Sequence, residues 1–152
     1  MRRHLASIAI AVAFLVTATI AALAQSEAPK PAAGGPALDG FCPVAYVEMN
    51  QAMKGDPQHK SEHQGRTFHF ANAEAKKMFD QAPAKYLPAY DGLCATGVSM
   101  GMKLPSDPKL FTVRDGRTYL FSDAEAKAIF EKDPKGVIAK ADANWSKVKQ
   151  QK

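Results

Sequence analysis

The sequence of 152 residues predicts an α+β fold, in which two pseudo-symmetric β-hairpin-plus-helix modules pack as one small domain. Three observations support this fold class. The chain contains an internal repeat, each copy has a glycine turn between two strand-like segments, and each turn is followed by an amphipathic helical pattern. Neither copy is large enough to bury a core alone, so we expect the two modules to pack against each other as a pseudo-twofold pair.

The repeat has a period of 51 residues. Residues 56–83 align with residues 107–134 without a gap, and 12 of the 28 aligned positions are identical, whereas chance would give about two. Upstream, the segments DGFC and DGLC match at a shift of 52, so one residue was inserted or lost between the two blocks. These matched segments contain the only two cysteines, Cys42 and Cys94.

Each module begins with a predicted hairpin. The turns are Gln64-Gly65 and Asp115-Gly116, which lie between strand-like segments. Glycine accepts the positive φ that two-residue hairpin turns require.

A helix follows each hairpin. Asn72 is the predicted N-cap of the first helix, and Ser122 with Glu125 predicts a capping box for the second. One buried stripe per helix is predicted, and a proline ends each helix. The stripes are Ala75, Met78 and Phe79, then Ala126, Ile129 and Phe130; the prolines are Pro83 and Pro134. The last residues predict a further amphipathic helix, with Trp145 packed on the core.

The N-terminus predicts export. Residues 1–24 have the basic start, apolar stretch and small-residue exit of a signal peptide, with an uncleaved membrane anchor as the alternative. Residues 25–37 are rich in Pro, Gly and Ala and predict a flexible leader. The modules then span residues 38–90 and 91–152. We expect a periplasmic or secreted protein that is free of the membrane after cleavage.

Composition and motifs disfavour several functions. Without residues 1–24 the chain has 18 Lys and Arg against 15 Asp and Glu. A net charge of about +3, dispersed along the chain, does not favour nucleic acid as a partner. The nucleophile, zinc-protease, phosphate-loop and C-x-x-C motifs are absent from the sequence. We therefore expect a protein that is not an enzyme.

The side chains that remain as candidates for a functional site are the sulfur-containing residues and the histidines. Cys42, Cys94, Met100 and Met102 supply soft donors that favour Cu(I), and His59 and His63 fall at an even spacing on one predicted strand. Three interpretations of the matched cysteines remain open at this point. They form a disulfide across a loop of roughly 50 residues, worth on the order of 4 kcal/mol; they bind one metal ion together; or they are separate buried thiols.

The segments LDGFCPVAYVEMNQAMKGDP, KYLPAYDGLCATGV and IAKADANW resemble the exported bacterial YHS-domain proteins, over about residues 38–145. YHS modules are similar to TRASH-type metal-binding domains. The resemblance implies a small α+β metal-binding module that handles copper, with Cys42 and Cys94 at the family's cysteine positions. The related F-C-S motif is replaced by Phe70-Ala71-Asn72 and Phe121-Ser122-Asp123, which makes zinc a weaker expectation than copper.

We thus expect an exported protein that binds Cu(I) through paired cysteines for delivery or sequestration. Met100, Met102, His63 and His59 would complete the metal site. The expected partners are the metal ion and a copper transporter or another exported metalloprotein, and a homodimer is compatible with the sequence. The alternative is a disulfide-stapled periplasmic module that binds a protein and no metal.

Overall fold

The computed structural model describes residues 35–152, so the predicted signal peptide and nearly all of the leader lie outside the described residues. The fold is α+β, as predicted. Among the described residues, no helix has the length and hydropathy needed to cross a membrane. The first module comprises η1 (Ala37–Gly40), α1 (Pro43–Met49), β1 (Asp56–His63), β2 (Arg66–Phe70), α2 (Ala73–Gln81) and α3 (Pro83–Tyr86). The second comprises η2 (Ala89–Gly92), α4 (Ala95–Ser99), β3 (Asp107–Arg114), β4 (Arg117–Phe121), α5 (Ala124–Lys132) and α6 (Pro134–Lys149).

Both predicted hairpins are present. β1 pairs with β2 and β3 with β4, each pair antiparallel, with a register shift at the same place in each module. Gln64 and Gly65 have φ of 51° and 72°, and Asp115 and Gly116 have 51° and 74°. Two consecutive positive φ values are the geometry of a type I′ turn, which matches the right-handed twist of the strands.

Each module also has a short 3-10 turn and a short helix that the sequence analysis did not predict. The 3-10 turns coincide with the matched Asp-Gly segments, and three consecutive residues in each are left-handed: Leu38, Asp39 and Gly40 in η1, and Tyr90, Asp91 and Gly92 in η2. Such residues are unfavourable unless they are Gly or, to a lesser degree, Asp or Asn. This backbone requirement accounts for the repeated Asp-Gly.

The hairpin helices α2 and α5 are capped at equivalent positions. Asn72 accepts a hydrogen bond from the Ala75 N–H at 2.9 Å, as predicted. In the second module the cap is Asp123, which accepts from the Ala126 N–H at 2.8 Å, so the predicted capping box from Ser122 was wrong. Asp123 is the repeat equivalent of Asn72, and its negative charge is favourable at a helix N-terminus.

A cluster of aromatic rings forms the core of each module. Phe68 and Phe70 pack on Phe79 of α2, with ring centroids 5.2 and 5.0 Å apart. Phe121 packs on Phe130 of α5 in the same way, at 5.0 Å. Ile129 departs from the prediction, since it is 40% exposed although it was expected in the buried stripe. Ile129 lies at the edge of the buried stripe, near Ser99 and Met100 at the C-terminal end of α4.

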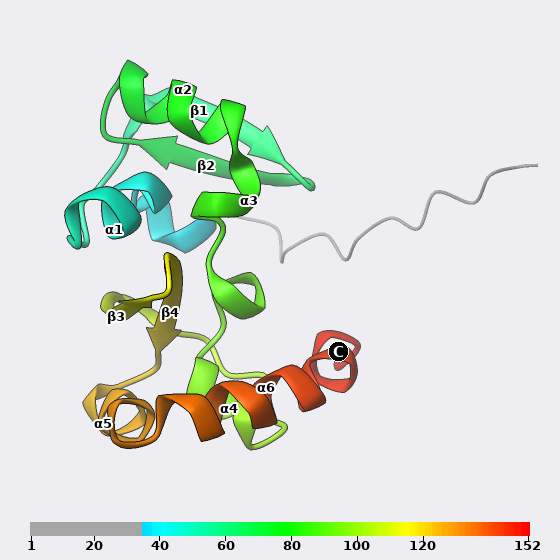
Figure 1. The fold of residues 1–152 in the computed structure, drawn as a ribbon. Helices are drawn as coiled ribbons and strands as arrows, with labels where there is room; N and C mark the ends of the chain where they lie inside the picture. The colour runs from blue at the N-terminus through cyan, green and yellow to red at the C-terminus, as the bar shows by residue number, and fades with distance from the viewer. Residues whose placement is uncertain (1–34) are drawn as a thin grey trace, which may run out of the picture.

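The predicted last helix is α6, which begins at Pro134 directly after the end of α5. Its buried residues are Val137, Ala141 and Val148. Trp145 is half-buried and meets the ring of Tyr90 edge-on, at 5.6 Å between centroids. The helix covers α4, as Figure 1 shows.

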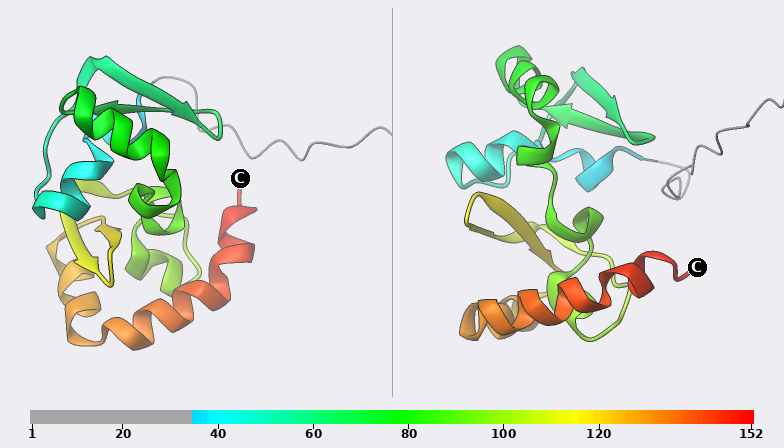
Figure 2. Two further views of the ribbon diagram at one scale, coloured as in Figure 1. Left: turned by 45° about the horizontal axis from the view of Figure 1, so that its top comes forward. Right: turned by 45° about the vertical axis from the view of Figure 1, so that its right-hand side comes forward.

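The modules share one internal arrangement but meet through unlike elements. α1 and α3 of the first module contact β4 of the second, and both views in Figure 2 place the second hairpin beneath the first module. The Tyr46 hydroxyl donates to the Pro108 carbonyl at 2.7 Å, and its ring meets Phe111 at 4.9 Å. Leu120 of β4 is fully buried in the hydrophobic cluster of the first module. This packing makes the two modules one domain.

Candidate metal site

The two matched cysteines are both free, fully buried and placed immediately before a short helix. Cys42 precedes α1 and belongs to the hydrophobic cluster of the first module, whereas Cys94 precedes α4 and belongs to that of the second. No disulfide joins them in the structure. Each thiol therefore has surroundings of its own, and these surroundings differ.

Two polar groups lie within hydrogen-bond distance of the Cys94 thiol. Its Sγ accepts a hydrogen bond from the Gly97 N–H at 3.4 Å, and the Ser122 hydroxyl lies 3.4 Å away. The same hydroxyl donates to Asp123 Oδ2 at 2.8 Å. Since a hydroxyl has one proton, Ser122 can donate to the sulfur or to the carboxylate, but not to both at once. Cys94, Ser122 and Asp123 thus form a short hydrogen-bonded chain.

The surroundings of Cys42 lack this chain. The equivalents of Ser122 and Asp123 are Ala71 and Asn72, and the Cys42 side chain caps no N–H of α1. Cys42 instead packs among apolar residues of the first module. Both copies of the duplicated position therefore hold a thiol buried in a hydrophobic cluster, but only the Cys94 sulfur has hydrogen-bonding groups beside it.

Two methionines, Met100 and Met102, follow the end of α4 and lie on the same side of the second module as Cys94. Gly101, with φ of 78°, reverses the chain there, and the Met102 N–H donates back to the Gly97 carbonyl at 2.9 Å. Asn50 takes the same left-handed position after α1, so Met49 is the equivalent of Met100. Met100 and Met102 are 57% and 42% exposed.

Cys94, Met100 and Met102 line one pocket of about 170 Å³. Three of the six residues predicted as metal ligands therefore line the same pocket, between the ends of α4 and β4 and the start of α5. The other residues that line this pocket are Thr96, Gly97, Leu104, Ser122, Asp123, Glu125, Ala126 and Ile129.

The pocket carries negative charge. Asp123 and Glu125 both line it. The hydrogen bond from the Ala126 N–H and the one from Ser122 lower the pKa of Asp123, so this carboxylate is ionised at neutral pH. A cation at the pocket would gain from both carboxylates.

The predicted histidine ligands lie elsewhere. His59 and His63 are on β1 in the first module, half-buried, and His63 meets the Phe79 ring edge-on at 5.9 Å. Neither lines the pocket at Cys94. Within residues 35–152, no three His, Cys, Asp or Glu side chains cluster closely enough to hold a metal. The donor set at the pocket is instead one thiol and two thioethers.

Sequence reasoning missed the roles of Ser122 and Asp123, because it assigned Ser122 to the helix cap. The repeat alignment contained the signal, since Asp123 aligns with Asn72, the correctly predicted cap of α2. Consistent use of the alignment would have left Ser122 free to contact Cys94. No protein-family model, curated protein or solved structure matches the chain.

Proposed function

We propose that this is an exported metal-binding protein that takes up Cu(I) at the pocket of Cys94, Met100 and Met102, for delivery or sequestration. The observation that carries the proposal is that these three sulfur-bearing residues line one small pocket. Cu(I) favours soft thiolate and thioether ligands. The resemblance to exported YHS-domain proteins and the predicted signal peptide support the location and the choice of metal.

Two hydrogen-bond donors beside Cys94 suit a sulfur that is bound to a metal as a thiolate. A thiolate accepts hydrogen bonds, and the Gly97 N–H and Ser122 hydroxyl are both within reach of Sγ. Ser122 also connects the sulfur to Asp123, which gives the departing proton a path toward the pocket surface. Because Cys94 is fully buried, uptake of the ion requires residues that line the pocket to move.

In this proposal Cys94 is the principal ligand, and Met100 and Met102 complete a three-coordinate sulfur site. Cys42 contributes to the core of the first module rather than to the metal. The paired-cysteine site expected from the sequence is thereby replaced by a site within the second module. The alternative was a module held together by a Cys42–Cys94 disulfide, without a metal. It gains no support, because the two thiols are free and belong to separate hydrophobic clusters.

The test is an anaerobic Cu(I) titration of the reduced protein, without residues 1–24, against a chromogenic Cu(I) chelator. The parent should bind one ion. Cys94→Ala should abolish competition with the chelator. M100L/M102L should weaken binding by a factor of about a hundred or more, since it removes two soft ligands and each is expected to cost at least about 1.4 kcal/mol.

The repeat supplies matched controls. Cys42→Ala removes an equally buried thiol, and Met49→Leu removes an equally exposed thioether, which is 53% accessible. Both should retain the affinity of the parent, provided that circular dichroism shows the variants to be folded. Equal losses from Cys42→Ala and Cys94→Ala would refute the single-module site in favour of a paired-cysteine site. Unchanged affinity in Cys94→Ala would refute both.

A further inference from the structure

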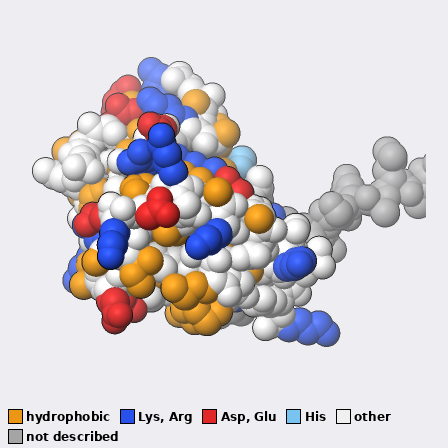
Figure 3. Space-filling view, turned by 60° about the horizontal axis from the view of Figure 1, so that its bottom comes forward, with side chains coloured by type: hydrophobic (Ala, Val, Ile, Leu, Met, Phe, Trp, Pro, Cys, Tyr) orange, Lys and Arg blue, Asp and Glu red, His pale blue; other side chains and the backbone are white. Residues whose placement is uncertain are grey.

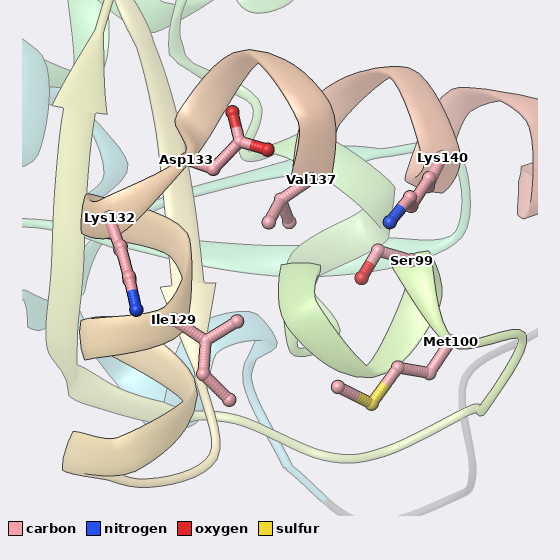
Figure 4. A pocket seen from close by; sticks show the side chains of 7 residues that line it. All are labelled: Ser99, Met100, Ile129, Lys132, Asp133, Val137 and Lys140. Atoms are coloured by element: carbon pink, nitrogen blue, oxygen red, sulfur yellow. The ribbon is translucent and has the colours of Figure 1, made fainter.

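A second, larger hollow adjoins the pocket at Cys94. It has a volume of about 560 Å³ and lies between the end of α4, α5 and the start of α6; we call it the α5–α6 groove. Its lining residues, drawn in Figure 4, are Ser99, Met100, Ile129, Lys132, Asp133, Val137 and Lys140. Met100 and Ile129 line both hollows, so the groove and the candidate metal pocket are neighbours.

The floor of the groove is apolar and accessible. Four large hydrophobic side chains are notably exposed in the described part of the chain. Two of them, Met100 and Ile129, line both hollows, and a third, Met102, lines the pocket at Cys94 alone. Figure 3 shows the molecule with its lower side turned forward, where hydrophobic side chains gather among charged ones of both signs. A concentration of exposed apolar side chains rimmed by charges is typical of a protein interaction surface.

The rim of the groove is basic. Lys132 and Lys140 lie on opposite sides of the floor in Figure 4, and neither belongs to an ion pair within residues 35–152. Asp133 also lines the groove, but its Oδ1 caps α6 by accepting from the Gly136 N–H at 3.0 Å, and the partial positive charge of this helix N-terminus offsets part of its negative charge. The two lysine charges are therefore available to a partner.

We propose that the α5–α6 groove is the docking surface for an acidic partner protein that presents a thioether or thiol and exchanges Cu(I) with the pocket at Cys94. The inference rests on the proposed function. Because Met100 lines both hollows, a partner seated in the groove would bring its own soft donor next to the ion. Cu(I) then passes without a change of oxidation state, as each new copper–sulfur bond forms while an old one breaks.

Charge decides which occupant the groove favours. Carboxylates on the partner would pair with Lys132 and Lys140, whereas a second copy of this chain in a symmetric contact would bring two more lysines to the same rim. Electrostatic complementarity mainly raises association rates and selects the partner. Such a transient contact suits a metal carrier, which must release its partner after exchange.

The test uses a synthetic probe, the peptide acetyl-Glu-Asp-Met-Gly-Met-Asp-Glu-amide, titrated into the metal-free ¹⁵N-labelled protein at low salt. The control peptide has Lys at the four acidic positions and the same two methionines. We expect the acidic peptide to shift the amide signals of the groove residues, with a dissociation constant on the order of 1 mM or below. Raising the salt to about 0.5 M should weaken this binding several-fold.

Charge reversal gives the matched variants. K132E/K140E should weaken binding of the acidic peptide by about tenfold and should create binding of the basic peptide. K60E/K77E makes the same change of charge at two exposed lysines of the first module and should alter neither. Equal effects of the two double variants, or signal shifts outside the groove, would overturn the docking surface. So would a dimer in sedimentation that Ile129→Glu dissociates.

The same variants separate this inference from the proposed function. The Cu(I) affinity of K132E/K140E should stay within about twofold of the parent, while Cu(I) transfer from the loaded acidic peptide should slow by about tenfold. Charge-dependent peptide binding by a protein that binds no Cu(I) would refute the proposed function and the exchange step together. Normal Cu(I) binding with no charge dependence in transfer would refute only the docking surface.

Discussion

Replacing Leu120 by alanine should destabilise both modules together. Leu120 is fully buried, comes from β4 and packs in the cluster of the first module. Truncating such a leucine typically costs 2–5 kcal/mol, and we expect about 3 kcal/mol here. With an unfolding entropy of about 2.1 cal/mol/K for each of roughly 118 folded residues, the melting temperature should fall by about 12 °C.

Urea unfolding followed by two probes tests this reasoning. Fluorescence of Trp145, the single tryptophan, reports on the second module, and far-ultraviolet circular dichroism reports on both. The two transitions should coincide in the parent and move together in Leu120→Ala. Ile129→Ala, at a half-exposed site, should cost well under 1 kcal/mol. A loss below about 1 kcal/mol in Leu120→Ala, or separate transitions in the parent, would refute a single cooperative domain.

Two further outcomes follow from individual hydrogen bonds. Tyr46→Phe removes the buried bond to the Pro108 carbonyl and should cost about 1–2 kcal/mol in urea unfolding; an unchanged midpoint would show that this bond contributes nothing to the joining of the modules. Asp123 has a lowered pKa in the folded state, so its contribution is complete above its unfolded pKa near 4 and is lost as the pH falls through the lower folded value. Asp123→Asn, which keeps a capping side chain without the charge, should flatten the dependence of stability on pH between about 2 and 5, and an unaltered slope would contradict this assignment.

Local patterns were sufficient to predict the hairpins and the helices that follow them. Gly65 and Gly116 mark turns whose geometry is decided within a few residues, and Pro134 separates α5 from α6 by removing a backbone donor. The short helices after the cysteines, α1 and α4, were missed because five to seven residues are too few to show a helical periodicity. The ends of these short helices are instead marked by residues that follow them, such as Asn50 and Gly101, which both have positive φ.

The candidate site was only partly predictable for a different reason. The alignment of Cys42 with Cys94 shows that the positions are equivalent in their modules, but whether equivalent positions meet depends on which faces the modules bury. That choice is made by long-range contacts, such as Tyr46 with Phe111 and Leu120 with the first module. Met100 and Met102 were found because they break the apolar periodicity, whereas Ser122 was assigned to a purely local role.

The contrast between Cys42 and Cys94 bears on how such a protein could acquire its chemistry. After a duplication, one copy can preserve the frame while the other accumulates polar substitutions next to its thiol without endangering the whole fold. Few substitutions would be needed to build the same site in the first module, because its backbone already has the same arrangement of elements. Ala71→Ser and Asn72→Asp would install the chain from sulfur to carboxylate, and Gln51→Met would supply the second thioether beside Met49. The first half of the molecule is thus a ready scaffold for a second site of the same kind.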